Sequence, residues 1–409
     1  MRLSTLRIAW RNLWRNRKRT ALALLAIAVG QWALLATQGL MRGYGDNVQR
    51  AITGPMIGHV QIHHPDYRDE RAMDLTIGNL SERVKQVAAL PQVADVAPRI
   101  IAPVLMAPER DAFIATVMGV DVASESKPFG LLSGAGEKLQ RRNVMLGYRL
   151  AERSDATVGQ EIAIVGQAAD GSLANDLYTV QAIVRGPASL LNQSGVVMHI
   201  EDAQKLMVMP DQAHEIVVRA HYADQVPQLL AGMKGVETLD GLEILPWRDL
   251  VPELVMIIDM VDYTGYFVLV LVLVAAVAGI VNTLMMATYE RMHEFGMLLA
   301  LGCRPARIVR MILIEALLIG VIGVLLGTAL GAGFVAATSV HGIDMASWGG
   351  EHMDELAYGG INMPLHIYPR LELSDPVIGL IAVMLFSLLA AVWPALVAGG
   401  LDPMEAMRT

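Results

Sequence analysis

The fold of this chain is decided by residues 289–302, YERMHEFGMLLALG. This charged segment lies between two long apolar runs, 263–287 and 308–335. A charged side chain costs about 2.5–3.5 kcal/mol or more at the centre of a bilayer, so the segment is expected at a membrane surface. Two membrane helices that meet in such a segment can be moved together by a protein that binds it.

Membrane spans account for most of the apolar composition. The chain has 54% hydrophobic and 18% charged residues, with a mean hydropathy of +0.43. Four runs reach the ~20 apolar residues that a spanning helix needs, and they lie at 20–40, 263–287, 308–335 and 376–397. The rest of the chain comprises the N-terminal segment 1–19, a large domain at 41–262, a connecting segment at 288–307, a loop at 336–375 and a tail at 398–409.

Lysine and arginine predict the orientation, because they are concentrated in cytoplasmic flanks of membrane proteins. The N-terminal segment holds Arg2, Arg7, Arg11, Arg15, Arg17, Lys18 and Arg19 and no acidic residue. The connecting segment and the start of the third span hold Arg291, Arg304, Arg307 and Arg310. The 336–375 loop is acidic, with Arg370 as its only basic side chain apart from histidine. We therefore predict cytoplasmic termini, with 41–262 and 336–375 on the outside.

The N-terminal segment has the pattern of an amphipathic helix that lies on the membrane and contacts its lipids. Trp10 and Trp14 recur at helical spacing, and Arg7, Arg11 and Arg15 form a stripe on another face. A solvated basic flank is the alternative. A cleaved signal peptide is not expected, because the following apolar run exceeds the usual 7–15 residues and no clear A-x-A site follows.

The domain at 41–262 is predicted to be α+β. Strands are expected at 57–63, 111–120, 161–165, 177–184, 195–200 and 215–220, and helices at 80–90, 200–209 and 225–234. Ser81 is expected to cap the first of these helices. Residues 245–260 are expected to form a helix that runs into the second span, with Pro252 in its first turn.

Two sets of residues in the spans attract attention. Gly323, Gly327 and Gly331 leave a smooth helix face for close packing, either against a second subunit or within the same chain. Asn282 and Glu315 are intramembrane polar residues. Arg310 or Asn282 is expected to satisfy Glu315.

The sequence shows no pattern of a catalytic or metal site. His293-Glu294 lacks the second histidine of H-E-x-x-H, and His63-His64 has no ligand cluster, so surface histidines are expected there. No G-x(4)-G-K-[ST] loop occurs, so this chain holds nothing to cradle ATP phosphates. Cys303 is the only cysteine, and the outer domain must fold without disulfides. The net charge of −8 argues against nucleic acid.

The chain resembles the MacB/FtsX/LolC-type ABC transporter permeases along its whole length. Their core motif is similar to N-x(7)-E-R-x-x-E-[FIL]-G-x(3)-A-[LI]-G, and it is matched by Asn282, Glu290, Arg291, Glu294, Gly296, Ala300 and Gly302. The close of the chain, LDPMEAMR at 401–408, resembles the family's P-x-E-A-[LM]-R ending. The pieces VADVAP at 93–98 and IEDAQKLM at 200–207 resemble parts of its outer domain.

The resemblance implies a multi-pass inner-membrane permease of the LolC/LolE kind, with its large domain periplasmic. It implies that Glu290, Arg291, Glu294, Phe295, Gly296, Leu298, Leu301 and Gly302 contact a separate cytoplasmic ABC ATPase dimer, which would bind the ATP and magnesium. A second permease copy and a lipoprotein, or a periplasmic acceptor of lipophilic cargo, would be further partners. The alternative is an FtsX-like scaffold that activates an external cell-wall hydrolase.

Overall fold

The computed structural model describes residues 10–11, 17–54, 56–126, 139–186, 188–345, 357–358, 361–362 and 366–400. The chain divides into two compact units. The membrane unit consists of 1–46, 257–348 and 366–409, and the outer domain consists of 47–256 and 349–365. Most of the predicted N-terminal helix and the end of the tail, from 401, lie outside the described residues.

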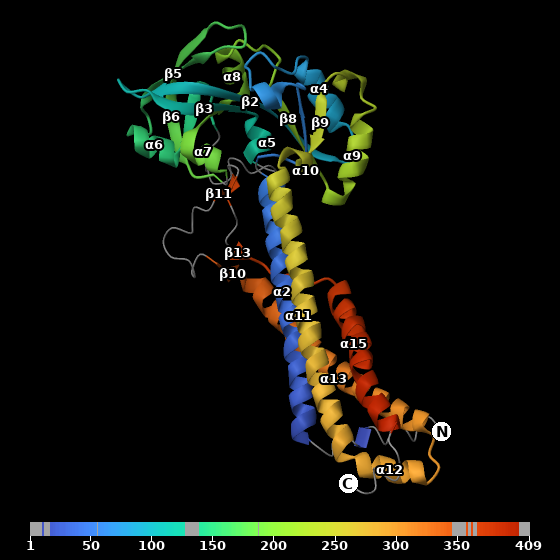
Figure 1. Cartoon of the computed structure of the whole chain (residues 1–409). Helices are drawn as coiled ribbons and strands as arrows, with labels where there is room; N and C mark the ends of the chain where they lie inside the picture. Colours follow the sequence, from blue (N-terminus) through green and yellow to red (C-terminus); the bar gives the residue numbers. More distant parts are fainter. Residues whose placement is uncertain are drawn as a thin grey trace. The chain divides into compact units, whose positions relative to one another are not determined.

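The outer domain is built on a nine-stranded sheet in the order β3-β7-β4-β6-β5-β2-β8-β1-β9 (Figure 1). Its strands are β1 (Val60–His63), β2 (Val93–Ala107), β3 (Phe113–Val120), β4 (Asn143–Gly147), β5 (Glu161–Gln167), β6 (Leu173–Val184), β7 (Gly195–His199), β8 (Glu215–Ala220) and β9 (Glu243–Pro246). Strand β2 pairs with β8, β3 and β5 along its length. The pairing of β2 with β3 closes six of the strands into a circuit.

Short helices accompany this sheet. They are α3 (Tyr67–Glu70), α4 (Leu80–Ala88), α5 (Val122–Ser126), α6 (Tyr148–Ser154), α7 (Ser189–Ser194), α8 (Ile200–Leu206), α9 (Val226–Met233) and α10 (Trp247–Leu250), with 3-10 turns η1 (Ala223–Gln225) and η2 (Glu237–Leu239). The strands β11 (Ala357–Tyr358) and β12 (Ile361–Asn362) pair separately. The α+β prediction is confirmed. The expected strands and helices exist with shifted ends, whereas β2, β4 and β9 were not predicted.

Two local predictions in this domain were wrong. Ser81 does not cap α4 with its side chain, because the N-cap residue is Asn79, and the Asp211 carboxylate accepts hydrogen bonds from the backbone N–H and hydroxyl of Ser81, at 3.0 and 2.6 Å. The expected helix at 245–260 is divided. Residues 243–246 form β9, α10 follows, and Val251, whose backbone is not helical (φ −135°, ψ 64°), separates it from α11, which begins at Pro252 as predicted.

His63 is buried, so the expectation of a surface histidine was wrong. It lies in β1 opposite Glu215 of β8 and Glu243 of β9, and its Nδ1 is 3.3 Å from Glu243. Nearby, His214 is fully buried. Its Nδ1 accepts the Ile101 N–H at 3.1 Å, and its Nε2 lies 3.2 Å from the Met73 carbonyl oxygen. This bonding fits a neutral ring, and burial lowers the pKa of His214.

The long helices are α2 (Arg17–Thr53), α11 (Pro252–Glu290), α13 (Pro305–His341) and α15 (Ser374–Gly399), with α12 (Met292–Ala300) between α11 and α13 (Figure 1). All of them lie in the membrane unit except the last residues of α2, from 47, and the first residues of α11, up to 256. Each long helix is long and apolar enough to cross a membrane. The short strands β10 (Ile343–Asp344) and β13 (His366–Ile367) pair before α15 begins. The predicted spans fall inside these helices, which extend beyond the predicted ends.

The glycine face of α13 packs within the chain. An added Cβ at Gly323 would lie 2.7 Å from the Ile27 side chain, at Gly327 2.5 Å from the Ala28 carbonyl oxygen, and at Gly331 2.8 Å from Leu35. All three neighbours belong to α2. Of the two alternatives, the structure supports close packing of α13 on α2 within the same chain.

We expect Gly327→Ala to destabilise the membrane unit by about 1–3 kcal/mol, because the new methyl group would overlap α2 backbone atoms. Gly333→Ala is the matched control on the same helix, since an added Cβ there has no neighbour within 4 Å. Thermal unfolding of the full chain in detergent, followed by circular dichroism, measures both. Equal melting temperatures for the two variants would contradict this packing.

Acidification is expected to destabilise the outer domain through His214. Because its pKa in the folded chain is below 6.5, the unfolded chain binds more protons, so this stabilisation is complete above pH 6.5 and is lost as pH falls. The effect of one group is at most about 1.4 kcal/mol per pH unit. His214→Gln should therefore melt with a shallower dependence between pH 7.5 and 5.5.

The comparison with the parent chain is necessary because other buried groups titrate. Burial also lowers the pKa of His59 and His63, which act in the same direction, and raises the pKa of Glu215, which acts in the opposite direction. Parallel melting curves for His214→Gln and the parent would show that His214 does not contribute.

Candidate functional site

The candidate site is α12, the short helix between α11 and α13. Helix α11 ends at Glu290, and Arg291 has a non-helical backbone (φ −112°, ψ 11°) that starts a new helix. The Arg291 N–H donates to the Thr288 carbonyl oxygen at 3.1 Å, and the Phe295 N–H donates to the Arg291 carbonyl oxygen at 2.9 Å. The chain thus changes direction at one residue.

Arg291 joins α12 to α13 through its side chain. Its Nη1 donates to both carboxylate oxygens of Glu315 at 3.4 Å, and its Nε donates to Glu294 at 3.3 Å. Arg291 and Glu315 are both buried. The sequence predicted Arg310 or Asn282 as the partner of Glu315, and the structure pairs it with Arg291 instead. The resemblance assigned Arg291 to a contact with the ATPase, whereas the structure buries its side chain against α13.

Phe295 contacts Arg291 and also packs against α11 and α13. The Arg291 guanidinium lies 4.9 Å from the centroid of the Phe295 ring, in the range of a cation–π contact. Phe295 is 1% exposed and packs in a core with Leu284 of α11 and with Ile308 and Ile312 of α13. Gly296 is buried beside it. These two residues, predicted to contact an ATPase, face the chain's own helices.

Gly302 ends α12. Its φ is +83°, a conformation that suits glycine. The Cys303 N–H donates to the Leu298 carbonyl oxygen and the Gly302 N–H to the Leu299 carbonyl oxygen, both at 2.9 Å. This bonding pattern is a Schellman motif, which satisfies the last carbonyl groups of a helix. Arg304 is extended, and Pro305 begins α13.

The outer face of α12 is apolar and uncovered. Met297 is 44% exposed, Leu298 41% and Leu301 85%. Glu290 is exposed next to this face, and the side chain of Glu294 is 44% exposed. Of the residues predicted to contact an ATPase, Glu290, Leu298, Leu301 and Gly302 are exposed and Glu294 is partly exposed. Asn282 is also exposed, on α11.

The described residues contain no group of three or more histidine, cysteine or acidic side chains that could hold a metal. Buried polar groups, Arg291 and Glu315, join α12 to α13. The exposed apolar side chains of α12 offer a surface for contact with another protein.

Glu315→Gln is expected to loosen α12, because it removes one partner of a buried ion pair, a change that typically costs about 3–5 kcal/mol. Hydrogen–deuterium exchange of the full chain in detergent should show faster exchange of the 292–300 amides. Arg307→Gln is the control, since Arg307 is exposed on the neighbouring helix. Unchanged exchange in Glu315→Gln would mean that packing of Phe295 alone holds α12.

Comparisons with known proteins agree with this architecture. Residues 20–236 match the family model of the MacB-like periplasmic core domain, and residues 266–403 match that of the FtsX-like permease C-terminal region. The lipoprotein-releasing system transmembrane protein LolC of Neisseria meningitidis is 23% identical over 76% of each chain. LolE of Haemophilus influenzae is 23% identical over 98% of each chain.

A third relative is the macrolide export ATP-binding/permease protein MacB of Azoarcus. It is 23% identical over 82% of this chain and 52% of its own length. Its name includes an ATP-binding part, and the present chain covers only about half of it. The two family models account for both the outer domain and the membrane unit, and the chain therefore belongs to the MacB/FtsX-type ABC transporter permeases, of the LolC/LolE/MacB kind.

Proposed function

We propose that this permease transmits ATP-driven motion of a separate cytoplasmic ATPase to its periplasmic domain, and that it releases lipoproteins or other lipophilic cargo from the inner membrane. The observation that carries the proposal is the exposed apolar face of α12. The helix presents Leu298 and Leu301 outward, while Arg291 and Phe295 hold its other face to the membrane helices.

An ATPase groove is the partner that best fits this helix. A short helix with exposed apolar side chains is suited to insertion into a groove of another protein. The basic residues around α12 favour the cytoplasmic side of the membrane, where ATP is available. ATP and magnesium would be bound by that partner, and this chain would be a non-catalytic subunit.

Motion of α12 has two routes into the rest of the chain. One is covalent, through Arg291 into α11, which is helical from Pro252 to Glu290. The other is the Arg291–Glu315 ion pair, which pulls on α13. With these two connections, α11 and α13 would move together with α12 as rigid bodies. The outer domain would be displaced in this way, with no aqueous pore for the cargo.

A second permease copy is the further partner that we propose. The glycine face of α13 is already covered by α2, so the exposed face of α11 is the better candidate for this contact. Asn282 lies on α11, and amide side chains in membrane helices commonly hydrogen-bond to a neighbouring helix. Lipoprotein cargo is supported by the printed names of the LolC and LolE relatives.

The expected outcome of Leu298→Asp and Leu301→Asp is loss of ATPase binding by at least about tenfold, because truncating or charging a central apolar anchor typically costs 2 kcal/mol or more. The full chain, captured from its own membrane, should co-purify an ABC ATPase, and the variants should lose it. Leu373→Asp is the control, since Leu373 is 90% exposed just before α15. ATPase recovery with all three variants would exclude α12 as the contact.

The same variants also separate transport from signalling. Loss of lipoprotein release from spheroplasts together with loss of ATPase binding would support the proposal. Normal lipoprotein release combined with failed activation of a wall hydrolase would instead support the FtsX-like scaffold.

A further inference from the structure

A cavity in the membrane unit is lined by residues of α2, α11 and α15 and of the segment just before α15. Its volume is about 400 Å³, which is within the range of small-ligand sites. One wall carries charged and polar side chains, including Gln38, Asp46 and Arg370. The cavity is also lined by the apolar side chains of Met41, Leu269 and Ile378. A site that is half polar and half apolar suits an amphiphile.

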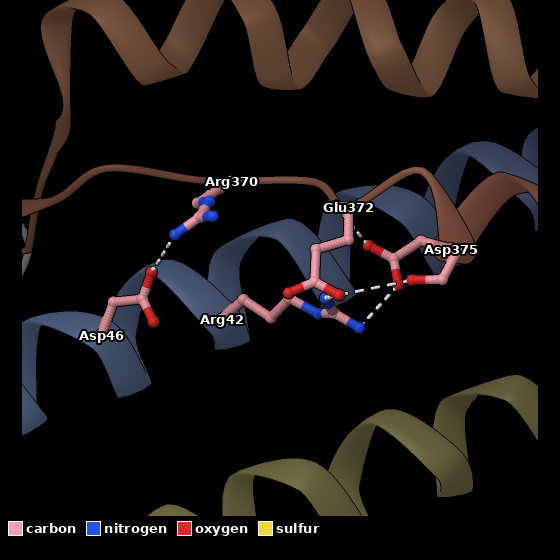
Figure 2. A network of polar contacts seen from close by, with 6 residues as sticks. Arg42, Asp46, Arg370, Glu372 and Asp375 are labelled. Atoms are coloured by element: carbon pink, nitrogen blue, oxygen red, sulfur yellow. Dashed lines mark hydrogen bonds and ion pairs between the residues drawn. The ribbon is translucent and has the colours of Figure 1, made fainter. Parts of the chain in front are cut away.

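The charged wall is held in place by the segment 366–375, which crosses α2. Figure 2 shows Arg370 directed at Asp46, at 3.4 Å, and Arg42 between Glu372 and Asp375, at 2.6 and 2.7 Å. The Arg370 N–H also donates to the Gly39 carbonyl oxygen at 3.0 Å. The side chain of Asp375 is 1% exposed. The wall is therefore formed before any ligand enters.

The ion pairs in this wall differ in how easily a ligand can replace them. The Arg42–Asp375 pair is sheltered, so it serves as a support. The Arg370–Asp46 pair is open, with side chains 67% and 43% exposed, and such pairs contribute only about 0–1 kcal/mol. A ligand with one positive and one negative group can replace this pair without leaving either charge uncompensated.

Two further features indicate where the positive group would lie. Gln38 lines the cavity, and its buried Oε1 has no hydrogen-bond partner in the described part of the chain, so this oxygen loses no bond when the amide turns toward a donor in the cavity. Tyr266 lines the same cavity, and its ring can attract a cation through its π-face. Acceptor, carboxylate and aromatic ring together favour an ammonium group.

We propose that this cavity binds the headgroup of an aminophospholipid. The ammonium contacts Gln38, Asp46 and Tyr266, and the phosphate contacts Arg370. The acyl chains leave along Met41, Leu269 and Ile378. The inference goes beyond the proposed function, since it adds a lipid ligand to the permease and needs neither ATPase nor cargo.

The test is binding of dihexanoyl phosphatidylethanolamine to the full chain in detergent, measured by native mass spectrometry and calorimetry. We expect it to bind at least about tenfold more tightly than dihexanoyl phosphatidylglycerol, which has no ammonium group, because a hydrogen bond to a charged group contributes about 1.5–3 kcal/mol. Gln38→Leu and Tyr266→Leu should each weaken phosphatidylethanolamine binding by about tenfold.

Tyr263→Leu is the matched control. Tyr263 is also exposed on α11, one turn before Tyr266, and is not among the described residues that line the cavity. Equal binding of the two lipids, or equal losses in Tyr263→Leu and Tyr266→Leu, would overturn the proposal. So would equally tight binding of free phosphoethanolamine, which indicates a site for a soluble ion. Tighter binding of an acylated lysine-bearing peptide would reassign the site to cargo.

Discussion

The ion pair between Arg291 and Glu315 constrains the position of α12 relative to α11 and α13. Both side chains are buried, in a region where unpaired charge is costly, so neither can leave without the other. The pair therefore fixes the angle at which α12 leaves α11 and the distance between α12 and α13. The exposure of Leu298 and Leu301 follows from that angle, because Phe295 and Gly296 occupy the opposite face. A looser joint would let the apolar face fold back onto the membrane helices.

The two ends of the membrane unit are stabilised in different ways. Near α12 the chain uses one buried pair and an apolar core. In the middle, α13 and α2 approach closely because glycine replaces side chains, and the fully buried Gln31 of α2 fits against Gly327 and Gly379. At the far end, α2 is held by Arg42 and by the 366–375 segment. The helices that lie between α12 and α2 are thus tightly packed.

Sequence patterns predicted the elements well where a single physical signal dominated. Long apolar runs predicted the membrane helices, and alternating β-branched residues predicted strands such as β8. Strand β2 was missed because Pro98 and Pro103 argue against a strand, although the structure pairs both with neighbours. Arg291, Phe295 and Gly296 were assigned to a partner because burial against the same chain has no local signature. The buried His63 and His214 were missed for the same reason, since only the register of β1 and β8 brings them together.

The sheet of the outer domain ends at β9, and this edge has a consequence for how copies of the permease coexist in a membrane. Strand β9 is four residues long and finishes with Pro246, which has no N–H to donate. On the other side, β3 is tied back to β2, which closes the circuit of strands. A short edge with a terminal proline is a poor template for strand addition. Crowded neighbouring domains can thus collide repeatedly without fusing their sheets or exchanging strands.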